Sequence, residues 1–149
     1  MLVYRIILSK YANKLVASGR AARWNPNDVE MIYTASSRSL ACLENVVHRS
    51  IATLTLAFEV LTIEIPSHIK TESILLKNLP ADWKDYDQIY RTQRIGEKWI
   101  NENNTAVLQV PSSIVSEEVN YLLNPKHKDF ADIKIIKRQP FVFDSRIKA

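Results

Sequence analysis

Residues 21–51 read AARWNPNDVEMIYTASSRSLACLENVVHRSI, and the rest of the chain is organised around this stretch. Its pattern predicts a loop, a short strand and a helix, in that order. The loop carries Arg23 in an Arg-Trp-Asn triplet, the strand carries Tyr33, and the helix carries Glu44. Together these side chains can bind a phosphate, stack on a ring and stabilise positive charge.

Turn-forming residues place the loop and the strand. The loop is predicted over Gly19–Asp28, which ends in the turn cluster Asn-Pro-Asn-Asp. The short run Met31–Thr34 predicts the strand. Either Ser36 or Ser37 can then cap the helix that follows.

The helix is predicted over Ser39–Ile51, because apolar residues recur there at helical spacing. The expected apolar stripe consists of Leu40, Leu43, Val47 and Ile51. Glu44 lies at the edge of this stripe, whereas Asn45 and Arg49 are expected on the other side. This placement indicates a carboxylate in a cleft. A surface pair between Glu44 and His48, four residues on, has equal weight on spacing alone.

Upstream, alternating β-favouring residues predict a strand over Leu2–Leu8. Arg5 lies on this apolar strand, where burial without a partner is costly. It therefore pairs with a carboxylate or faces a cleft, and the ion pair is slightly favoured. A short helix is expected over Lys10–Ser18, ended by Gly19.

Downstream, Ser112 and Ser113 follow a predicted strand and lie where side chains commonly project into a site. The other expected elements are a bulged strand or two strands within Leu54–Ile65, irregular chain over Ile69–Asp87, a helix over Tyr90–Asn101, a strand over Ala106–Val110, and closing strands at Ile133–Ile136 and Phe141–Phe143.

Length and composition predict one folded domain over residues 1–149, with 46% apolar and 24% charged residues. Twenty Lys and Arg against sixteen Asp and Glu give a net charge of +4, which suits phosphate-bearing ligands or an acidic partner. A solvated basic surface is the more ordinary interpretation. The single cysteine, Cys42, excludes an internal disulfide. We expect a cytoplasmic protein, because neither a signal peptide nor a membrane-spanning run is recognisable.

Several kinds of site are not expected. The only glycines are Gly19 and Gly96, so no glycine-rich phosphate loop is present. The three histidines show no metal-ligand spacing, and we expect no metal. Ser112 lacks the glycines of a nucleophile elbow. The remaining candidates are arginine, tyrosine, glutamate and serine.

At these residues the chain resembles RES-domain proteins, the toxins of RES–Xre type II toxin–antitoxin pairs. The matching segments, in order, are Tyr4-Arg5, Arg23-Trp24-Asn25, Ile32-Tyr33-Thr34, Leu40-Ala41 with Glu44, Gly96 with Trp99, Val110-Pro111-Ser112, Asn120-Tyr121-Leu122-Leu123-Asn124-Pro125 followed by His127, and Phe143-Asp144 with Arg146. Family members often carry glycines where this chain has Ala21 and Ala22, and again near Asn27-Asp28.

The resemblance implies an α/β (α+β) fold similar to ADP-ribosyltransferase toxins, with small, mostly antiparallel sheets and flanking helices. It also implies an enzyme that consumes NAD as substrate and needs no cofactor. The implied partner is a cognate Xre-type antitoxin with a C-terminal toxin-binding domain, which covers the active-site opening and alone contacts DNA. No membrane partner is implied, and a homodimer within the toxin–antitoxin complex is one assembly left open.

The resemblance carries over a set of site residues: Arg23, Tyr33, Glu44, Ser112 and, as a less certain fifth, Arg5. Glu44 is expected to hold a ribose hydroxyl and stabilise an oxocarbenium-like ribose. Arg23, with Arg5, would bind the diphosphate. Tyr33 would stack on nicotinamide or ribose, and Ser112 would hydrogen-bond the substrate.

Three other functions stay open. The same pocket suits an ADP-ribosyltransferase that modifies a protein or a nucleotide. A basic nucleic-acid-binding regulator would show binding that weakens steeply with salt and no NAD loss. A catalytically inactive scaffold that only binds its antitoxin is the least favoured, because the arginine, tyrosine, glutamate and serine occur together.

Overall fold

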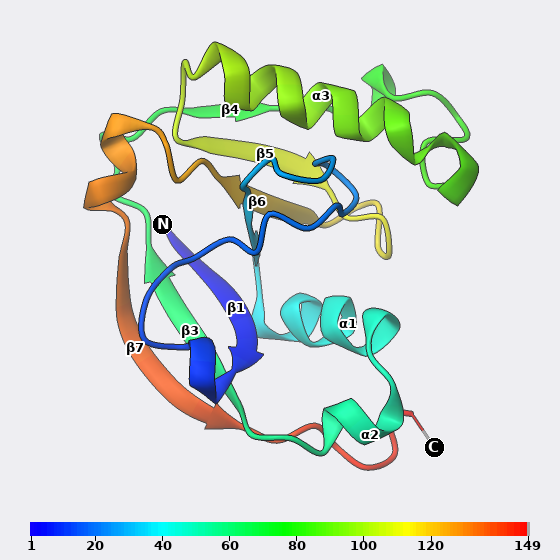
Figure 1. The fold of residues 1–149 in the computed structure, drawn as a ribbon, viewed down its shortest axis with the longest axis vertical. Coiled ribbons are helices and arrows are strands. Elements are labelled where there is room, and N and C mark those ends of the chain that lie inside the picture. The colour runs from blue at the N-terminus through cyan, green and yellow to red at the C-terminus, as the bar shows by residue number, and fades with distance from the viewer. Residues whose placement is uncertain (149) are drawn as a thin grey trace.

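The computed structural model describes residues 1–148, whose strands form one seven-stranded sheet (Figure 1). The strands are β1 Leu2–Leu8, β2 Ile32–Ala35, β3 Phe58–Glu64, β4 Thr71–Ser73, β5 Val107–Pro111, β6 Val119–Leu123 and β7 Lys134–Phe141. Their order across the sheet is β4-β5-β6-β2-β1-β3-β7, and only β4 and β5 pair in parallel. The predicted α+β class and mostly antiparallel pairing are confirmed, although the strands form one continuous sheet.

Helices accompany both halves of this sheet. The α-helices are α1 Arg38–His48, α2 Ile51–Leu54 and α3 Ile89–Glu102, and the 3-10 helices are η1 Ser9–Tyr11, η2 Leu76–Asn78, η3 Tyr86–Gln88 and η4 Lys128–Asp132. In Figure 1, α3 lies along the half that contains β4 and β5, whereas α1 lies beside β1 and β2. No helix in residues 1–148 is long and apolar enough to cross a membrane.

The sheet is weakly joined at its centre. β1 pairs with β3 along its whole length, but it meets β2 at one paired position, Tyr4 opposite Ala35. Figure 1 shows the strands of the β1-β3-β7 half running in a clearly different direction from β4, β5 and β6. Antiparallel strands that share a single pair diverge on either side of it, so an opening can form between them.

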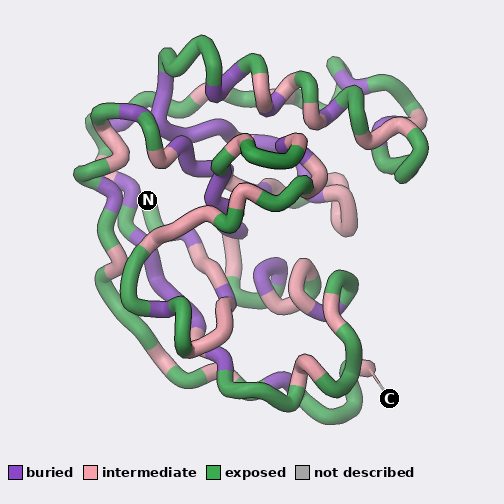
Figure 2. The backbone as a smooth tube through the Cα atoms, in the orientation of Figure 1, coloured by how far each residue is buried: buried purple, intermediate pink, exposed green. Residues whose placement is uncertain are grey.

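Three apolar clusters support this arrangement, and Figure 2 shows the buried positions concentrated along the strands. One cluster includes Ile32 and Ile63 on one face of the sheet. The second lies under α3 and contains three tryptophans, Trp24, Trp83 and Trp99. The third lies under α1. Trp24 and Trp99 are therefore core residues, with exposed fractions of 2% and 3%.

The apolar stripe predicted for α1 is wrong. Leu40 is buried, but Leu43, Val47 and Ile51 are 40%, 51% and 55% exposed. The helix instead turns Asn45 toward the sheet, where Asn45 Nδ2 donates to the carbonyl of Ile6 at 3.2 Å. The spacing of large apolar residues misidentified the buried face, because small and polar residues occupy much of the contact.

The helix expected over Lys10–Ser18 is reduced to the single turn η1. The chain beyond it forms no further helix and packs Ala12, Leu15 and Ala17 against the first apolar cluster. A short helix has little stability of its own, so this tertiary burial decides the conformation. Gly19 therefore does not end a helix. Its left-handed backbone, with φ of 72°, instead helps close a loop in which Asp28 N donates to Gly19 O at 2.7 Å.

Other elements differ from prediction in their limits. The two closing strands are one strand, β7, with a register shift opposite Thr62 and Ile63 of β3. The apolar phase change within Leu54–Ile65 arises because Leu54 ends α2, while β3 is buried on both faces from Val60 to Ile63. Two strands were not predicted: β6, and β4 within Ile69–Asp87.

Candidate active site

A cleft of about 790 Å³ opens beside the single β1–β2 pair. It is bounded by β1, β2, α1 and the loop that precedes β2. The polar side chains that line it are Tyr4, Arg5, Arg20, Arg23, Tyr33, Glu44, Asn45, His48, Arg49, Tyr86, Gln93, Ser113 and Asn120. Four arginines and a single carboxylate make this lining suited to an anionic ligand.

Arg23 projects from the loop that precedes β2. Its Nη1 donates to the carbonyl of Trp83 at 3.1 Å, and its Nη2 donates to the carbonyl of Lys84 at 3.0 Å. Partial burial lowers the pKa of Arg23, while the nearby Tyr33 and Glu44 act in the opposite direction. Neutral carbonyls hold the guanidinium in place without neutralising its charge, so that charge remains for a ligand.

Tyr33 lies on the cleft wall and anchors the same loop. Its hydroxyl donates to Asn25 Oδ1 at 2.5 Å and accepts from the backbone N–H of Trp24 at 3.0 Å. Burial raises the pKa of Tyr33 well above its ordinary value, so the phenol stays protonated. Its fixed hydrogen bonds make Tyr33 a support for the Arg-Trp-Asn triplet as well as a wall of the cleft.

Replacing Tyr33 with phenylalanine is expected to destabilise the protein by about 1–3 kcal/mol, because Asn25 Oδ1 would lose a buried partner. Urea unfolding measures the change. Tyr121→Phe is the matched control, since its hydroxyl makes no hydrogen bond within residues 1–148 and its loss should change stability little. Equal effects of the two substitutions would contradict the anchoring role of Tyr33.

Glu44 makes no pair with His48; two neutral donors from distant parts of the chain hold it instead. Its Oε1 accepts from Ser112 Oγ at 3.1 Å and from Asn120 Nδ2 at 2.7 Å. Its other oxygen, Oε2, makes no hydrogen bond within the described chain. The glutamate therefore belongs to the cleft, and the surface-pair interpretation is wrong.

Ser112 lies behind Glu44 and not in the cleft. Its side chain is fully buried, and its Oγ also accepts from the backbone N–H groups of Ile114 and Val115 at 3.1 and 3.2 Å. The donor and both acceptor positions of this hydroxyl are thus in use. A direct hydrogen bond from Ser112 to substrate, as expected from the resemblance, does not agree with this placement.

Arg5 reaches the cleft from β1. Its Nη1 is enclosed and has no hydrogen-bond partner among residues 1–148, and no carboxylate of these residues forms an ion pair with it. The favoured ion-pair interpretation of Arg5 is therefore wrong. Burial lowers the pKa of Arg5 to about 10, which leaves it charged at neutral pH. An unpaired buried cation is unfavourable until an anion approaches it.

The structure thus brings Arg5, Arg23, Tyr33 and Glu44 to one cleft and places Ser112 directly behind it. Asn120, which contacts Glu44, was missed as a site residue. The signal for it was a polar residue inside an otherwise apolar run, within the Asn-Tyr-Leu-Leu-Asn-Pro segment.

The loop that carries Arg23 follows a defined path in spite of its few glycines. Asp28 takes a left-handed backbone with φ of 69°, close to where the family resemblance implies a glycine. The carbonyl of Arg23 accepts from Thr92 Oγ1 of α3, and the carbonyl of Ala22 accepts from Gln93 Nε2 of the same helix. The loop is therefore fastened to α3 as well as to Tyr33.

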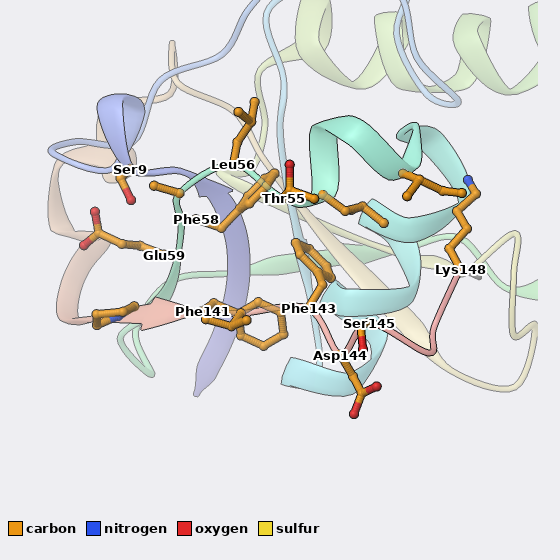
Figure 3. Close-up of a pocket in the computed structure, with 15 residues that line it drawn as sticks. Ser9, Thr55, Leu56, Phe58, Glu59, Phe141, Phe143, Asp144, Ser145 and Lys148 are labelled. Atoms are coloured by element: carbon orange, nitrogen blue, oxygen red, sulfur yellow. The ribbon is translucent and has the colours of Figure 1, made fainter.

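A second cavity, of about 750 Å³, lies between α2, the start of β3 and the end of β7 (Figure 3). Phe58, Phe141 and Phe143 gather there, with neighbouring rings edge to face at 5.0 Å. None of the expected site residues lines it. Within residues 1–148, no group of three His, Cys, Asp or Glu side chains is placed to hold a metal ion.

Comparisons with known proteins agree with the family resemblance. The RES domain model matches residues 2–144. A protein of Sphingobium sp. named "Prs ADP-ribosylating toxin" is 41% identical over 128 residues, covering 84% of this chain and 79% of that protein. A "Toxin Res" of Yersinia enterocolitica is 35% identical, covering 99% of this chain and all of that protein.

A solved structure shares the fold. A chain in the crystal structure of the M. tuberculosis MbcT–MbcA toxin–antitoxin complex superposes with a TM-score of 0.77, covering 95% of this chain and 84% of that chain. The sequence identity is 16%, so this likeness concerns the fold alone.

Proposed function

The chain belongs to the RES domain family, and from this membership and the cleft we propose that it is a toxin of a type II toxin–antitoxin pair that degrades NAD. The bond cleaved would be the one between nicotinamide and ribose. Two proteins to which it is similar bear the name toxin, and one of them is named as ADP-ribosylating. The second name supports an ADP-ribose donor as substrate.

The proposal depends mainly on the surroundings of the Glu44 carboxylate. Neutral donors hold one oxygen of its carboxylate, while the charge itself is paired with no cation in the described chain. Such a carboxylate can stabilise a positive charge that develops beside it. The arginines nearby, Arg5 and Arg23, supply the complementary attraction for a diphosphate.

The proposed reaction needs no general acid. The bond from the anomeric carbon to the pyridinium nitrogen breaks, and its electron pair neutralises the departing nicotinamide. The ribose becomes oxocarbenium-like, and an oxygen of water or of phosphate forms the new bond and loses its proton to solvent. Glu44 would stabilise the cationic ribose, and the ring of Tyr33 would form a wall against it. Ser112 would act through Glu44.

Purified protein incubated with NAD tests this proposal. We expect stoichiometric release of nicotinamide, and the second product identifies the acceptor. Free ADP-ribose indicates water and its phosphorylated form indicates phosphate. Label on a protein or a nucleotide supports the alternative, ADP-ribosyl transfer, which the name of the Sphingobium relative favours. Unchanged NAD together with salt-sensitive nucleic-acid binding would support a binding protein instead.

The proposed partner is an Xre-type antitoxin whose C-terminal domain covers the cleft, with DNA contacted only through that antitoxin. The solved structure with the same fold is a toxin–antitoxin complex. Addition of the purified antitoxin is expected to stop nicotinamide release. Continued turnover in a stable complex would exclude a cleft-covering antitoxin.

Replacing Arg23 with lysine is expected to lower kcat/KM for NAD by roughly 10–100-fold, mainly through KM. A lysine ammonium cannot span the carbonyls of Trp83 and Lys84 and also present a forked pair of donors to a diphosphate. Steady-state kinetics measure the change. Arg146→Lys is the control, because Arg146 is 89% exposed and lines neither cavity. A KM equal to that of the wild type would exclude Arg23 from phosphate binding.

A further inference from the structure

Asn120 contacts the cleft carboxylate from the middle of the sheet. It lies on β6, where its neighbours across the strands are Ala35 and Val110. The side chain is 9% exposed, and its Nδ2 donates to Glu44 Oε1 at 2.7 Å. This distance is shorter than the 3.1 Å from Ser112 Oγ to the same oxygen. Asn120 is thus the nearer of the two donors to Glu44.

The orientation of the Asn120 amide follows from this contact. Rotating the amide by half a turn would direct Oδ1 at the carboxylate, so that two acceptors would face each other. With Nδ2 toward Glu44, however, Oδ1 is buried and has no partner among residues 1–148. Buried acceptors are seldom left unpaired, because their lost hydration is not replaced. The contact with Glu44 therefore comes at the expense of stability.

An apolar side chain of similar size would fill this position without an unpaired acceptor. An arginine or a lysine would hold Glu44 but would also neutralise its charge. A neutral amide fixes the carboxylate by a hydrogen bond, which an apolar side chain cannot do. It also leaves the negative charge of Glu44 for the substrate, which a cation would not do. Because both donors bind Oε1, they also limit rotation of the carboxylate and leave Oε2 for the cleft.

We propose that Asn120 is a positioning residue for the NAD-cleaving carboxylate. With Ser112 it holds Oε1 of Glu44, so that Oε2 faces the ribose on which positive charge develops. This role rests on the proposed NAD cleavage. It explains why the unpaired Oδ1 is retained: Asn120 contributes to the rate of the reaction and detracts from folding.

The test replaces Asn120 with leucine, which keeps the size but removes both the donor and the unpaired acceptor. We expect kcat for NAD to fall by roughly 10–100-fold, because small misplacement of a catalytic group is costly. KM should stay within about twofold, and the thermal midpoint should equal or exceed that of the wild type. Asn120→Asp, which keeps the shape but places a second acceptor beside Glu44, should lose activity as well.

Thr34→Val is the matched control. Thr34 is a buried polar residue on the neighbouring strand, and its Oγ1 donates to the carbonyl of Tyr121 at 2.7 Å. It makes no hydrogen bond with Glu44. This substitution should lower the thermal midpoint and leave kcat unchanged, the opposite of the result expected for Asn120→Leu.

A double substitution shows whether Asn120 acts through Glu44. In a Glu44→Gln background, Asn120→Leu should cause little further loss of the residual rate. The positioning role would be overturned if the rate loss of the double variant equalled the product of the losses in the two single variants. A normal kcat in both Asn120 variants would also overturn it. A wild-type protein that releases no nicotinamide would overturn the proposed function, and the positioning role with it.

Discussion

Replacing Glu44 with glutamine is expected to lower NAD cleavage by at least roughly 10²–10³-fold while the protein stays folded. The glutamine carbonyl can accept the same hydrogen bonds from Ser112 Oγ and Asn120 Nδ2 that Oε1 accepts now. The shape of the site and its internal contacts are therefore kept. What is lost is the negative charge beside the ribose. Nicotinamide release measures the loss of activity and thermal unfolding measures any loss of stability. Both are measured on the same preparation.

Glu117→Gln is the control for this change in charge, because Glu117 is exposed and does not line the cleft. It should retain the activity of the wild type. Near-normal turnover in Glu44→Gln would overturn the assignment of Glu44, and with it the proposed mechanism. A loss of activity accompanied by unfolding would contradict the expectation that the amide preserves the contacts of the carboxylate.

Replacing Gly96 with alanine is expected to destabilise the protein by about 3 kcal/mol or more. A Cβ at this position would lie 1.7 Å from the carbonyl oxygen of Trp24 and 3.0 Å from Met31 Cε. A contact with backbone cannot be relieved by a change of rotamer, so α3 and the Arg23 loop would have to separate. We expect a lower urea midpoint and a loss of NAD cleavage in the fraction that remains folded.

Lys98→Ala on the same helix provides the comparison. Lys98 is 76% exposed and, among residues 1–148, pairs only with Glu102, so its loss should change stability by less than about 0.5 kcal/mol. If Gly96→Ala and Lys98→Ala had the same free energy of unfolding, α3 would not approach the loop as closely as described. Wild-type activity in Gly96→Ala would show that Arg23 does not depend on this contact.

Local patterns in the sequence were sufficient for several elements. The alternation over Leu2–Leu8 gave β1 with its observed limits, and Ser37, one of the two expected caps, accepts a hydrogen bond from the backbone N–H of Leu40 at the start of α1. These features depend on neighbouring residues, whose geometry is the same in most folds. The arginine, tyrosine and glutamate of the cleft were expected from segments whose order along the chain resembles a known family.

The spacing of apolar residues gave wrong predictions where contacts between distant segments decide the local structure. The face of α1 was misassigned, because Asn45 turns toward the sheet and donates to the carbonyl of Ile6, 39 residues away. The helix predicted over Lys10–Ser18 stops after the turn η1 and irregular chain follows, because its apolar side chains gain more from the first cluster than from a helical turn. Neither outcome is visible in the spacing of large apolar residues.

The sequence by itself determined the class of fold and which charged residues the chain has available for a site. Only the tertiary structure decided what each one does. Ser112 and Asn120 reach Glu44 across 68 and 76 residues of sequence, and Arg5 has no carboxylate partner in the described chain. A hydrogen bond depends on a few tenths of an ångström between two atoms, and only the packed sheet sets that distance for atoms so far apart in the chain.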